Sequence, residues 1–301
     1  MPPCHPIGPT PAQRCAKTAP RAGQRLFTGA PPGARRTGLR GLTLAASMAL
    51  ALATAPALAQ EAAPRQDLTA VPVVRSFNLV GLGVGMLPEF SGSRDLRAMV
   101  LPVLRASWKD KVFINALQGG VWLLDSDDKT FRVGLAIEPR FGWEAKDGTL
   151  VTGMERREFS LEAGPNVQWR TPVGVVNANW YQDISGASNG QTAQLQFIRS
   201  LVNLQGGSLR LNGVVGAQWF AGKTNNYYFG VRPSEATAQR PAYTAGSTVN
   251  LQLGVNGVYL LGRGSLLFGA IGNWLGNEAA QSPIVETRFQ PIAYVGYGIN
   301  F

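Results

Sequence analysis

The sequence predicts an all-β protein: a transmembrane antiparallel up-and-down β-barrel of twelve strands, with ten as the alternative, after a cleaved signal peptide. Three observations lead to this prediction. The chain of 301 residues is 45% hydrophobic and only 15% charged, whereas about a quarter of a soluble domain is charged. Apolar and polar residues alternate with period two from about residue 74 onward. Aromatic residues gather near the ends of these alternating segments, as they do at membrane interfaces.

The first part of the chain has the pattern of an export signal. A basic stretch ending at Arg40 precedes an apolar run of small residues, and Ala57-Leu58-Ala59 then fits the pattern that signal peptidase cleaves. The apolar run is too short for a spanning helix. We therefore expect 1–59 to be a signal peptide with an extended basic leader. Residues 60–73 are expected to form a periplasmic segment, and 74–301 the barrel.

Most of the positive charge belongs to this leader. Of the 28 basic residues seven lie in 1–59, which contains no acid, so the rest carries 21 basic and 18 acidic side chains, a net charge of about +3. A nucleic-acid-binding protein would keep its basic patch, so no nucleic-acid partner is expected. Cys4, Cys15 and His5 are the chain's only cysteines and histidine. The barrel is therefore expected to lack disulfides, thiolate or imidazole metal sites, cofactors and catalysis by Cys or His.

The strands are assigned from the alternation. In 249–261 the odd positions are mainly Val, Leu and Tyr, while the first even positions carry Asn, Gln and Gly. Such a pattern gives a sheet one apolar and one polar face, and a membrane barrel turns the apolar face to lipid. The predicted strands are 74–87, 97–108, 111–118, 119–125, 129–143, 157–170, 173–184, 190–204, 207–220, 247–261, 265–275 and 287–301.

The connections support the barrel over a soluble sandwich, which is the alternative architecture. Tight turns alternate with long polar loops at 144–156, 222–246 and 276–286, and outer-membrane barrels have short periplasmic turns and long extracellular loops. The least certain assignment is the division of 111–125 into a hairpin at Gly119-Gly120. If this segment is one strand, the count of twelve fails and ten is the alternative.

The last strand ends in an aromatic residue. Tyr297, Ile299 and Phe301 alternate on its apolar face, a pattern that resembles the signal read by the outer-membrane insertion machinery. We therefore expect this machinery and outer-membrane lipid as partners, and the Gram-negative outer membrane as the location.

Several segments together resemble the MipA/OmpV family of outer-membrane proteins. The first is Gly81–Ser93 (GLGVGMLPEFSGS), similar to the first strand and loop of that family, and the second is Gln118–Asp125 (QGGVWLLD), similar to its Gly-Gly hairpin. The loop Tyr228–Pro233 (YFGVRP) and the segments Pro241–Tyr243, Ala245-Gly246 and Ser282–Val285 follow in the same order. The resemblance spans about 74–301.

The resemblance implies an outer-membrane β-barrel without known catalytic residues. The best-known member of the family joins a membrane-bound lytic transglycosylase to a bifunctional penicillin-binding murein synthase. Other members are described as porin-like. The resemblance therefore implies a scaffold for murein-remodelling enzymes, with a murein transglycosylase and a penicillin-binding protein as candidate partners.

Three motifs are weighed as catalytic or ligand sites and set aside. Gly81–Gly85 lacks the spacing of a nucleotide-binding loop, and no helix follows it. Asp125–Asp128 begins like a calcium loop, but it lacks the Gly and the closing Glu, so a solvated turn is expected. Glu158 and Glu162 would lie about 13 Å apart along one strand, beyond the ~5–9.5 Å of paired glycosidase carboxylates. We therefore expect no enzyme.

Two groups of residues remain as candidates for function. The inward charges either pair across strands and stiffen the barrel, or line a narrow aqueous path and set its ion preference. The long loop at 222–246 concentrates aromatic and arginine side chains of the kind that dominate binding interfaces, and it would plug the lumen or bind an external ligand. The lumen candidates are Arg132, Glu138, Arg140, Glu158, Glu162 and Arg210, and the loop candidates are Tyr227, Tyr228, Phe229, Arg232 and Tyr243.

Two functions follow from these expectations. A scaffold for peptidoglycan hydrolase and synthase complexes rests on the resemblance alone. A small-solute or antibiotic-permeable, porin-like channel rests on the polar lumen. A murein enzyme would have to contact the periplasmic side, where the turns are short and the segment from Gln60 to Val73 is the main additional chain.

Overall fold

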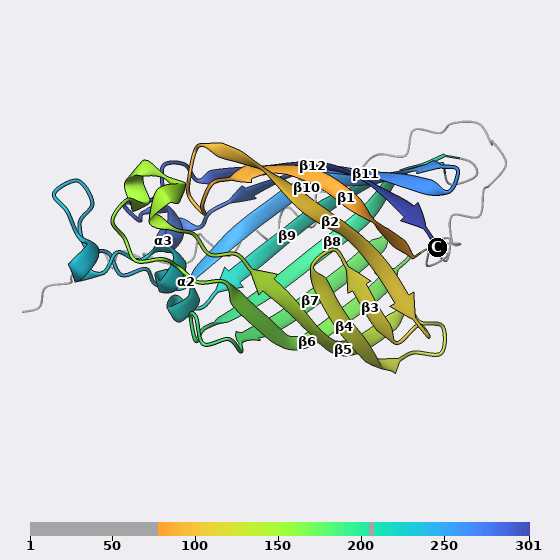
Figure 1. The fold of residues 1–301 in the computed structure, drawn as a ribbon. Helices are drawn as coiled ribbons and strands as arrows, with labels where there is room; N and C mark the ends of the chain where they lie inside the picture. Colours follow the sequence, from red (N-terminus) through yellow and green to blue (C-terminus); the bar gives the residue numbers. More distant parts are fainter. Residues whose placement is uncertain (1–77, 205–207) are drawn as a thin grey trace, which may run out of the picture. The chain divides into compact units, whose positions relative to one another are not determined.

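The computed structural model describes residues 78–204 and 208–301, and it is a closed antiparallel β-barrel of twelve strands (Figure 1). This confirms the predicted fold class and the strand number. The strands are β1 (Leu79–Pro88), β2 (Leu96–Trp108), β3 (Val112–Asn115), β4 (Gln118–Asp125), β5 (Phe131–Arg140), β6 (Ser160–Thr171), β7 (Gly174–Asp183), β8 (Gln191–Asn203), β9 (Leu209–Phe220), β10 (Thr248–Leu261), β11 (Gly264–Trp274) and β12 (Phe289–Asn300).

Each strand pairs with its neighbours in the sequence, and the first strand closes the ring with the last. The β1–β12 ladder runs from Leu79 opposite Asn300 to Met86 opposite Ala293. Closure leaves no free pair of outer edges, and it satisfies the backbone hydrogen-bonding groups that a bilayer cannot satisfy. The predicted signal peptide, 1–59, and the predicted periplasmic segment, 60–73, lie outside the described residues.

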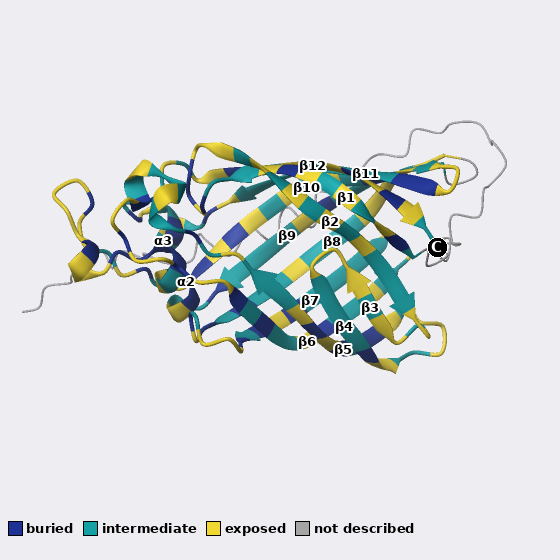
Figure 2. Ribbon diagram, viewed as in Figure 1, coloured by how far each residue is buried: buried dark blue, intermediate teal, exposed yellow. Residues whose placement is uncertain are grey.

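The alternation of the sequence becomes an outward apolar face and an inward polar face (Figure 2). Leu82 and Val100 are each 67% exposed and Leu253 is 58% exposed, although all three are large hydrophobic residues. Asn250 and Thr248, on the opposite face of β10, are buried. Large hydrophobic side chains such as Leu82, Val100 and Leu253 are stable on the outside of a barrel only where lipid covers them.

The connections differ at the two ends of the barrel. The segments 89–95, 141–159, 184–190, 221–247 and 275–288 lie at one end, here called the loop end. The segments 109–111, 126–130, 172–173 and 262–263 lie at the other, here called the turn end. No helix in the described ranges is long and apolar enough to cross a membrane.

The β3–β4 hairpin exists, but its turn lies three residues before the predicted position. It falls at Ala116, which takes a left-handed conformation with φ 54°. Gly119 and Gly120 instead lie inside β4. A Cβ on Gly120 would come within 2.4 Å of the Phe113 ring, so a larger residue would not fit there. The pair of glycines therefore allows the Phe113 ring to lie against the strand and does not form the turn.

The predicted strand 129–143 is too long at the loop end. Trp143, the aromatic residue at its predicted end, was expected at the membrane interface, but it is 3% exposed and lies in the packed loops. Its strand, β5, ends at Arg140 because the chain then turns into the loop packing. Trp108, Trp169, Trp180 and Trp274 do present exposed faces near strand ends, with exposures of 64%, 52%, 42% and 41%.

Candidate functional site

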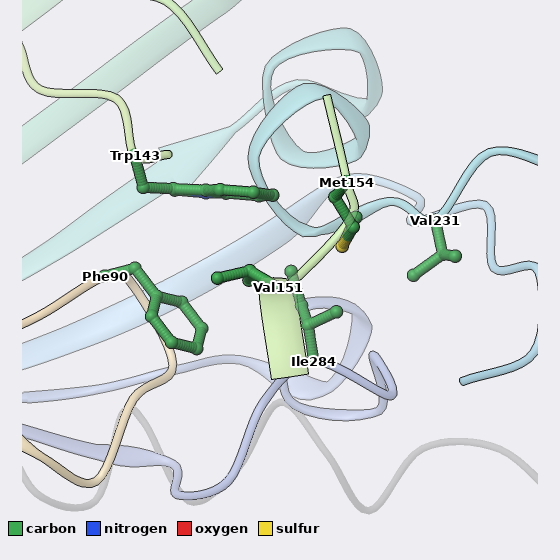
Figure 3. Packing of buried hydrophobic residues seen from close by; sticks show 6 residues of the cluster. All are labelled: Phe90, Trp143, Val151, Met154, Val231 and Ile284. Carbon is green, nitrogen blue, oxygen red and sulfur yellow. The ribbon is translucent and has the colours of Figure 1, made fainter. Parts of the chain in front are cut away.

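The long loops at the loop end form a packed layer, here called the cap, built on two apolar clusters. The first cluster unites side chains from four loops, and its members face one another in Figure 3. The second lies on the inward-facing Phe220 at the end of β9. The buried members are Phe90, Trp143, Val151, Met154, Val231 and Ile284 in the first, and Phe220, Tyr228, Phe229, Ala245, Leu275 and Ala279 in the second.

Helix α2 (Gly222–Phe229) joins the cap to the barrel wall. The hydroxyl of Thr224 donates to the carbonyl oxygen of Gln191 on β8 at 3.0 Å. The Asn225 amide donates to the carbonyl oxygen of Gly246 at 2.7 Å. Because Tyr228 and Phe229 pack on Phe220, this helix lies over the loop-end mouth of the lumen.

A buried ion pair forms the polar core of the cap. The guanidinium of Arg157 donates to both carboxylate oxygens of Glu235, each at 2.8 Å. The side chains are only 1% and 3% exposed. Arg157 also donates to the carbonyl oxygens of Tyr227 and Glu155, at 2.8 and 2.9 Å, and stacks 5.0 Å from the Trp143 ring. Bidentate pairing with every donor used is the arrangement in which a buried charge pair is tolerated.

Glu235 is held as a carboxylate by this arrangement. Burial by itself raises the pKa of Glu235, but the hydrogen bonds from Arg157 and from the backbone amides of Arg232 and Glu155 outweigh it. Together they lower the pKa from 4.5 to about 2. The ion pair is therefore fully formed at neutral pH.

Inside the barrel, Arg140 and Glu162 pair directly beneath the cap. Arg140 Nε and Nη2 donate to the two oxygens of Glu162 at 2.7 and 2.9 Å. The Thr192 hydroxyl donates to the same carboxylate at 2.8 Å. The Arg140 guanidinium also lies 4.6 Å from the ring of Phe220, so it connects the lumen wall to the second cap cluster.

The other lumen candidates have partners along the wall. Glu138 accepts a bond of 3.4 Å from Gln118, whose amide also donates to Tyr181 at 2.8 Å. At the turn end Arg132 donates to Asp125 at 2.9 Å. Arg210 lies on the inward side of β9, and its Nε is buried without a hydrogen-bond partner among the described residues.

Rows of amide side chains cross the lumen wall between these charged pairs. The Gln196 amide donates to Gln252 at 2.6 Å, and the Gln252 amide donates to Asn273 at 3.1 Å. Asn212 donates to Asn256 at 3.0 Å. Polar groups on adjacent strands, and across Gly216 of β9 in the case of Gln196 and Gln252, thus satisfy one another, which stiffens the wall.

Glu158 does not belong to the lumen, which corrects one prediction. Its side chain is 58% exposed and lies 3.3 Å from Arg156. The predicted strand began at residue 157, whereas β6 begins at Ser160. Residues 157–159 belong to the cap because Trp143 and Arg157 form an isolated bridge there.

The five loop candidates divide into two groups. Tyr228 and Phe229 are 2% and 1% exposed, so they are cap residues and cannot form an exposed interface. Tyr227, Arg232 and Tyr243 line a cavity of about 320 Å³, together with Lys223 and Arg157. The lining of this cavity includes three basic and no acidic side chains. Arg157 is paired with Glu235 and Arg232 with Glu155, so of the three only Lys223 has no carboxylate partner among the described residues.

Tyr297, Ile299 and Phe301 all face outward at the turn end. Their exposures are 48%, 57% and 73%. The backbone amide of Phe301 donates to the carbonyl oxygen of Asn78 at 3.0 Å. Their role in membrane insertion stays a prediction.

The sequence analysis did not identify the Arg157–Glu235 pair or Arg240. Arg240 is 6% exposed and donates to the carbonyl oxygen of Thr152 at 3.0 Å and to that of Glu235 at 2.7 Å. These residues are far apart in the sequence and carry no local motif. The one available signal was indirect: the segments that resemble the MipA/OmpV family contribute Phe90, Phe229, Val231, Tyr243, Ala245 and Ile284 to the cap clusters.

Comparisons with known proteins agree with this architecture. A family model described as "MltA-interacting protein MipA" matches residues 80–301. The chain is 31% identical to "Outer membrane protein Omp26La" of Vibrio anguillarum over 49% of its own length and 57% of that protein. It is 32% identical to "Outer membrane protein OmpV" of Vibrio cholerae over the same shares. The chain thus spans little more than half the length of these two relatives.

A third relative is similar over more of the chain. "MltA-interacting protein" of Escherichia coli is 23% identical over 74% of this chain and 89% of that protein. Among solved structures, a "Bacterial polysaccharide outer membrane secretin" aligns with 76% of this chain and 99% of its own, at 9% identity and a TM-score of 0.36.

Proposed function

The chain belongs to the MipA family of outer-membrane β-barrel proteins, and from that premise we propose that it is a non-enzymatic scaffold for murein-remodelling enzymes. The candidate partners are a murein transglycosylase and a penicillin-binding murein synthase. The protein resides in the outer membrane, like the relatives named for that location. The name "MltA-interacting protein" of the Escherichia coli relative supports an interaction of this kind.

The observation that carries the proposal is the covered loop-end mouth of the lumen. The cap lies over one mouth through α2, with the fully bonded Arg157–Glu235 pair at its centre. Just beneath it Arg140 and Glu162 neutralise each other. A barrel arranged in this way is a rigid membrane platform, and a platform suits a scaffold better than it suits an open channel.

The turn end is the surface we assign to the partners. Asn78 and Phe301 meet there, and short turns face the periplasm in barrels of this type. The connections 109–111 and 126–130 carry exposed charges that are tied into a network. It includes Lys129–Asp110, Lys111–Asp125 at 3.1 Å and Arg132–Asp125 at 2.9 Å. Such a charged, ordered edge suits electrostatic recognition of a periplasmic protein.

The test is binding of purified enzymes to the full chain in lipid nanodiscs. We expect both a lytic transglycosylase and a penicillin-binding murein synthase to bind. The charge reversals Lys111→Glu and Lys129→Glu should weaken binding about tenfold, the effect of ~1.4 kcal/mol. Lys146→Glu, a charge reversal at a still more exposed lysine of the loop end, is the control and should not weaken it. If the unaltered chain binds neither enzyme, the scaffold proposal is refuted.

A porin-like channel for small solutes or antibiotics is the second candidate, favoured by the amide rows of the lumen. Planar-bilayer recordings separate the two functions. A scaffold with a capped lumen gives no reproducible unitary steps, whereas a channel gives steps whose size changes in Glu162→Gln.

A further inference from the structure

The barrel wall is incomplete between β2 and β5 in its loop-end half. Hairpin β3–β4 fills the wall there, but β3 pairs with β2 only from Arg105 to Trp108. β4 pairs with β5 no farther than Ile137. Beyond the hairpin, Leu96–Leu104 of β2 and Glu138–Arg140 of β5 have no strand partner on that side among the described residues. In Figure 1 β2 continues well past the end of the hairpin.

The unpaired strand lengths give the size of this interruption in the backbone. Eight residues of β2, Leu96–Val103, lie beyond the hairpin, which is about 26 Å of strand at ~3.3 Å per residue. The hairpin accounts for three strand spacings between β2 and β5, about 14 Å at ~4.8 Å each. We call the interruption the window.

Both edges of the window carry a proline. The carbonyl of Leu104 accepts from the amide of Ala116 in the hairpin at 2.7 Å. Alternate residues point the same way, so the imide nitrogen of Pro102 faces the window. On β6 the backbone amide of Leu161 donates to the hydroxyl of Ser185, and its carbonyl oxygen accepts from the amide of Ile184. Both groups of Leu161 therefore point away from β5. Its partner Pro139 therefore also faces the window.

These prolines make the window unsuitable for an added strand. Free strand edges attract other strands, and proline on an edge prevents such pairing by removing a donor. Irregular backbone at membrane depth is tolerated where it lines a cavity or is covered by protein. Since both edges have lost a donor, the favoured arrangement is an opening into the lumen.

The cap bounds the window on the loop-end side. Arg97 at the start of β2 pairs with Asp147 at 3.4 Å, and Phe90 lies 6.1 Å from Trp143. A cavity of about 250 Å³ lies at this boundary. Its lining carries Arg97, Lys146, Arg156, Arg157, Glu144 and Asp147. Each of the four basic side chains is paired with a carboxylate, Arg156 with Glu158 and Arg157 with Glu235 among them.

On the β2 side of the window, the lumen wall is apolar between Arg97 and Arg105. Leu101 and Val103 face inward on β2, opposite to the exposed Val100 and Leu104. They lie against inward glycines: a Cβ on Gly85 would be 2.8 Å from Leu101, and one on Gly296 would be 2.6 Å from Val103. Because Gly85 and Gly296 have no side chains, Leu101 and Val103 have room along the wall. An apolar surface thus continues from the lipid-facing side of β2 to its inner side.

From these observations we propose that the window is a lateral portal that admits the hydrocarbon chain of an amphiphile from the bilayer into the lumen. The chain lies along Leu101 and Val103. The polar head stays near the cavity at the loop-end boundary, whose lining consists of paired charges with no excess of positive charge. The portal requires no opening of the cap, and it is independent of the murein scaffold.

The first test measures access of lipid chains to the lumen face. Leu101 and Leu267 lie in one row of the ladder, through Gly83 and Gly296, and both face inward. Leu267 is far from the window, on an unbroken part of the wall. In a Cys4→Ser, Cys15→Ser background, Leu101→Cys and Leu267→Cys are labelled with the same small fluorophore. The protein is then placed in bilayers with brominated acyl chains.

We expect several-fold stronger quenching for the label at position 101 than for that at 267. Labels at Val100→Cys and Phe268→Cys, the outward residues next to them, set the level for full contact with lipid. Equal, weak quenching at 101 and 267 would overturn the portal. Weak quenching at both 100 and 101, with strong quenching at 268, would show that a protein strand covers the window, and would also overturn it.

The second test concerns the head group. Because the charges at the boundary are paired, a dodecyl phosphate and a dodecyl maltoside, each with a spin label on its chain, should quench the label at 101 at similar concentrations. A large advantage of either head group would show that a specific head-group site, and not the apolar wall, holds the amphiphile, and would overturn the proposal.

Discussion

Arg157 and Glu235 are 78 positions apart in the chain and pair inside the cap. Removing one partner leaves the other charge buried, which costs about 3–5 kcal/mol. Arg157→Met should therefore destabilise the cap strongly, as measured by denaturant unfolding followed through Trp143 fluorescence. Arg157→Met combined with Glu235→Leu should recover part of the loss, because no charge then remains buried. Strict additivity of the two substitutions would contradict a direct pairing.

The same pair gives the cap a defined response to acid. Because folding lowers the pKa of Glu235 from 4.5 to about 2, the carboxylate stabilises the cap fully above pH ~4.5. This stabilisation, about 3 kcal/mol, is lost as the pH falls from ~4.5 to ~2.

Glu235→Gln is expected to lack this acid-dependent component, whereas Glu158→Gln, which alters an exposed carboxylate, should retain it. The measurement is the rate of proteolysis within 222–246 in an acid-stable protease assay between pH 2 and 6. Parallel curves for the unaltered protein and Glu235→Gln would show that another group controls the transition.

At the scale of elements, the two glycines of β4 provide a matched pair. A Cβ on Gly120 would lie 2.4 Å from the Phe113 ring and 2.6 Å from the carbonyl oxygen of Leu135. The nearest atoms to a Cβ on Gly119 are at 3.8 and 3.9 Å. Gly120→Ala should therefore destabilise the barrel by about 1–3 kcal/mol through overpacking.

Gly119→Ala should be neutral or slightly stabilising, since alanine loses less backbone entropy on folding. Urea unfolding of the two variants in the same lipid compares them directly. Equal effects would mean that the Phe113 ring moves aside without cost.

These elements also indicate what a single sequence can predict. The period-two alternation specified the outward face, because every strand meets the same lipid on one side. The predicted position of the hairpin turn was wrong because Gly119-Gly120 is a turn signal locally, while the actual role of these glycines depends on Phe113 from the preceding strand, β3. The cap carried no periodic signal at all: Arg157, Glu235 and Arg240 meet only after the loops fold.

At the scale of the whole molecule, the closed ladder is uneven in strength. β9 and β10 pair continuously from Thr248 opposite Phe220 to Tyr259 opposite Leu209. β3, by contrast, pairs with its neighbours only over Val112–Asn115. Ring closure makes unfolding cooperative, because an opened seam exposes backbone groups to hydrocarbon. The short hairpin is therefore the place where that cost is lowest.

Two measurements follow from this uneven ladder. In electrophoresis with SDS, the unheated protein should migrate as a compact band and convert to the unfolded band on boiling, in a single step. Before that transition, amide hydrogen exchange should be fastest in β3 and slowest in β9 and β10, because local opening follows the number of cooperating pairs. If β9 and β10 exchange as fast as β3, the seam at the hairpin is not the weak point. The window above it would then have to be held open by something other than the short length of the hairpin.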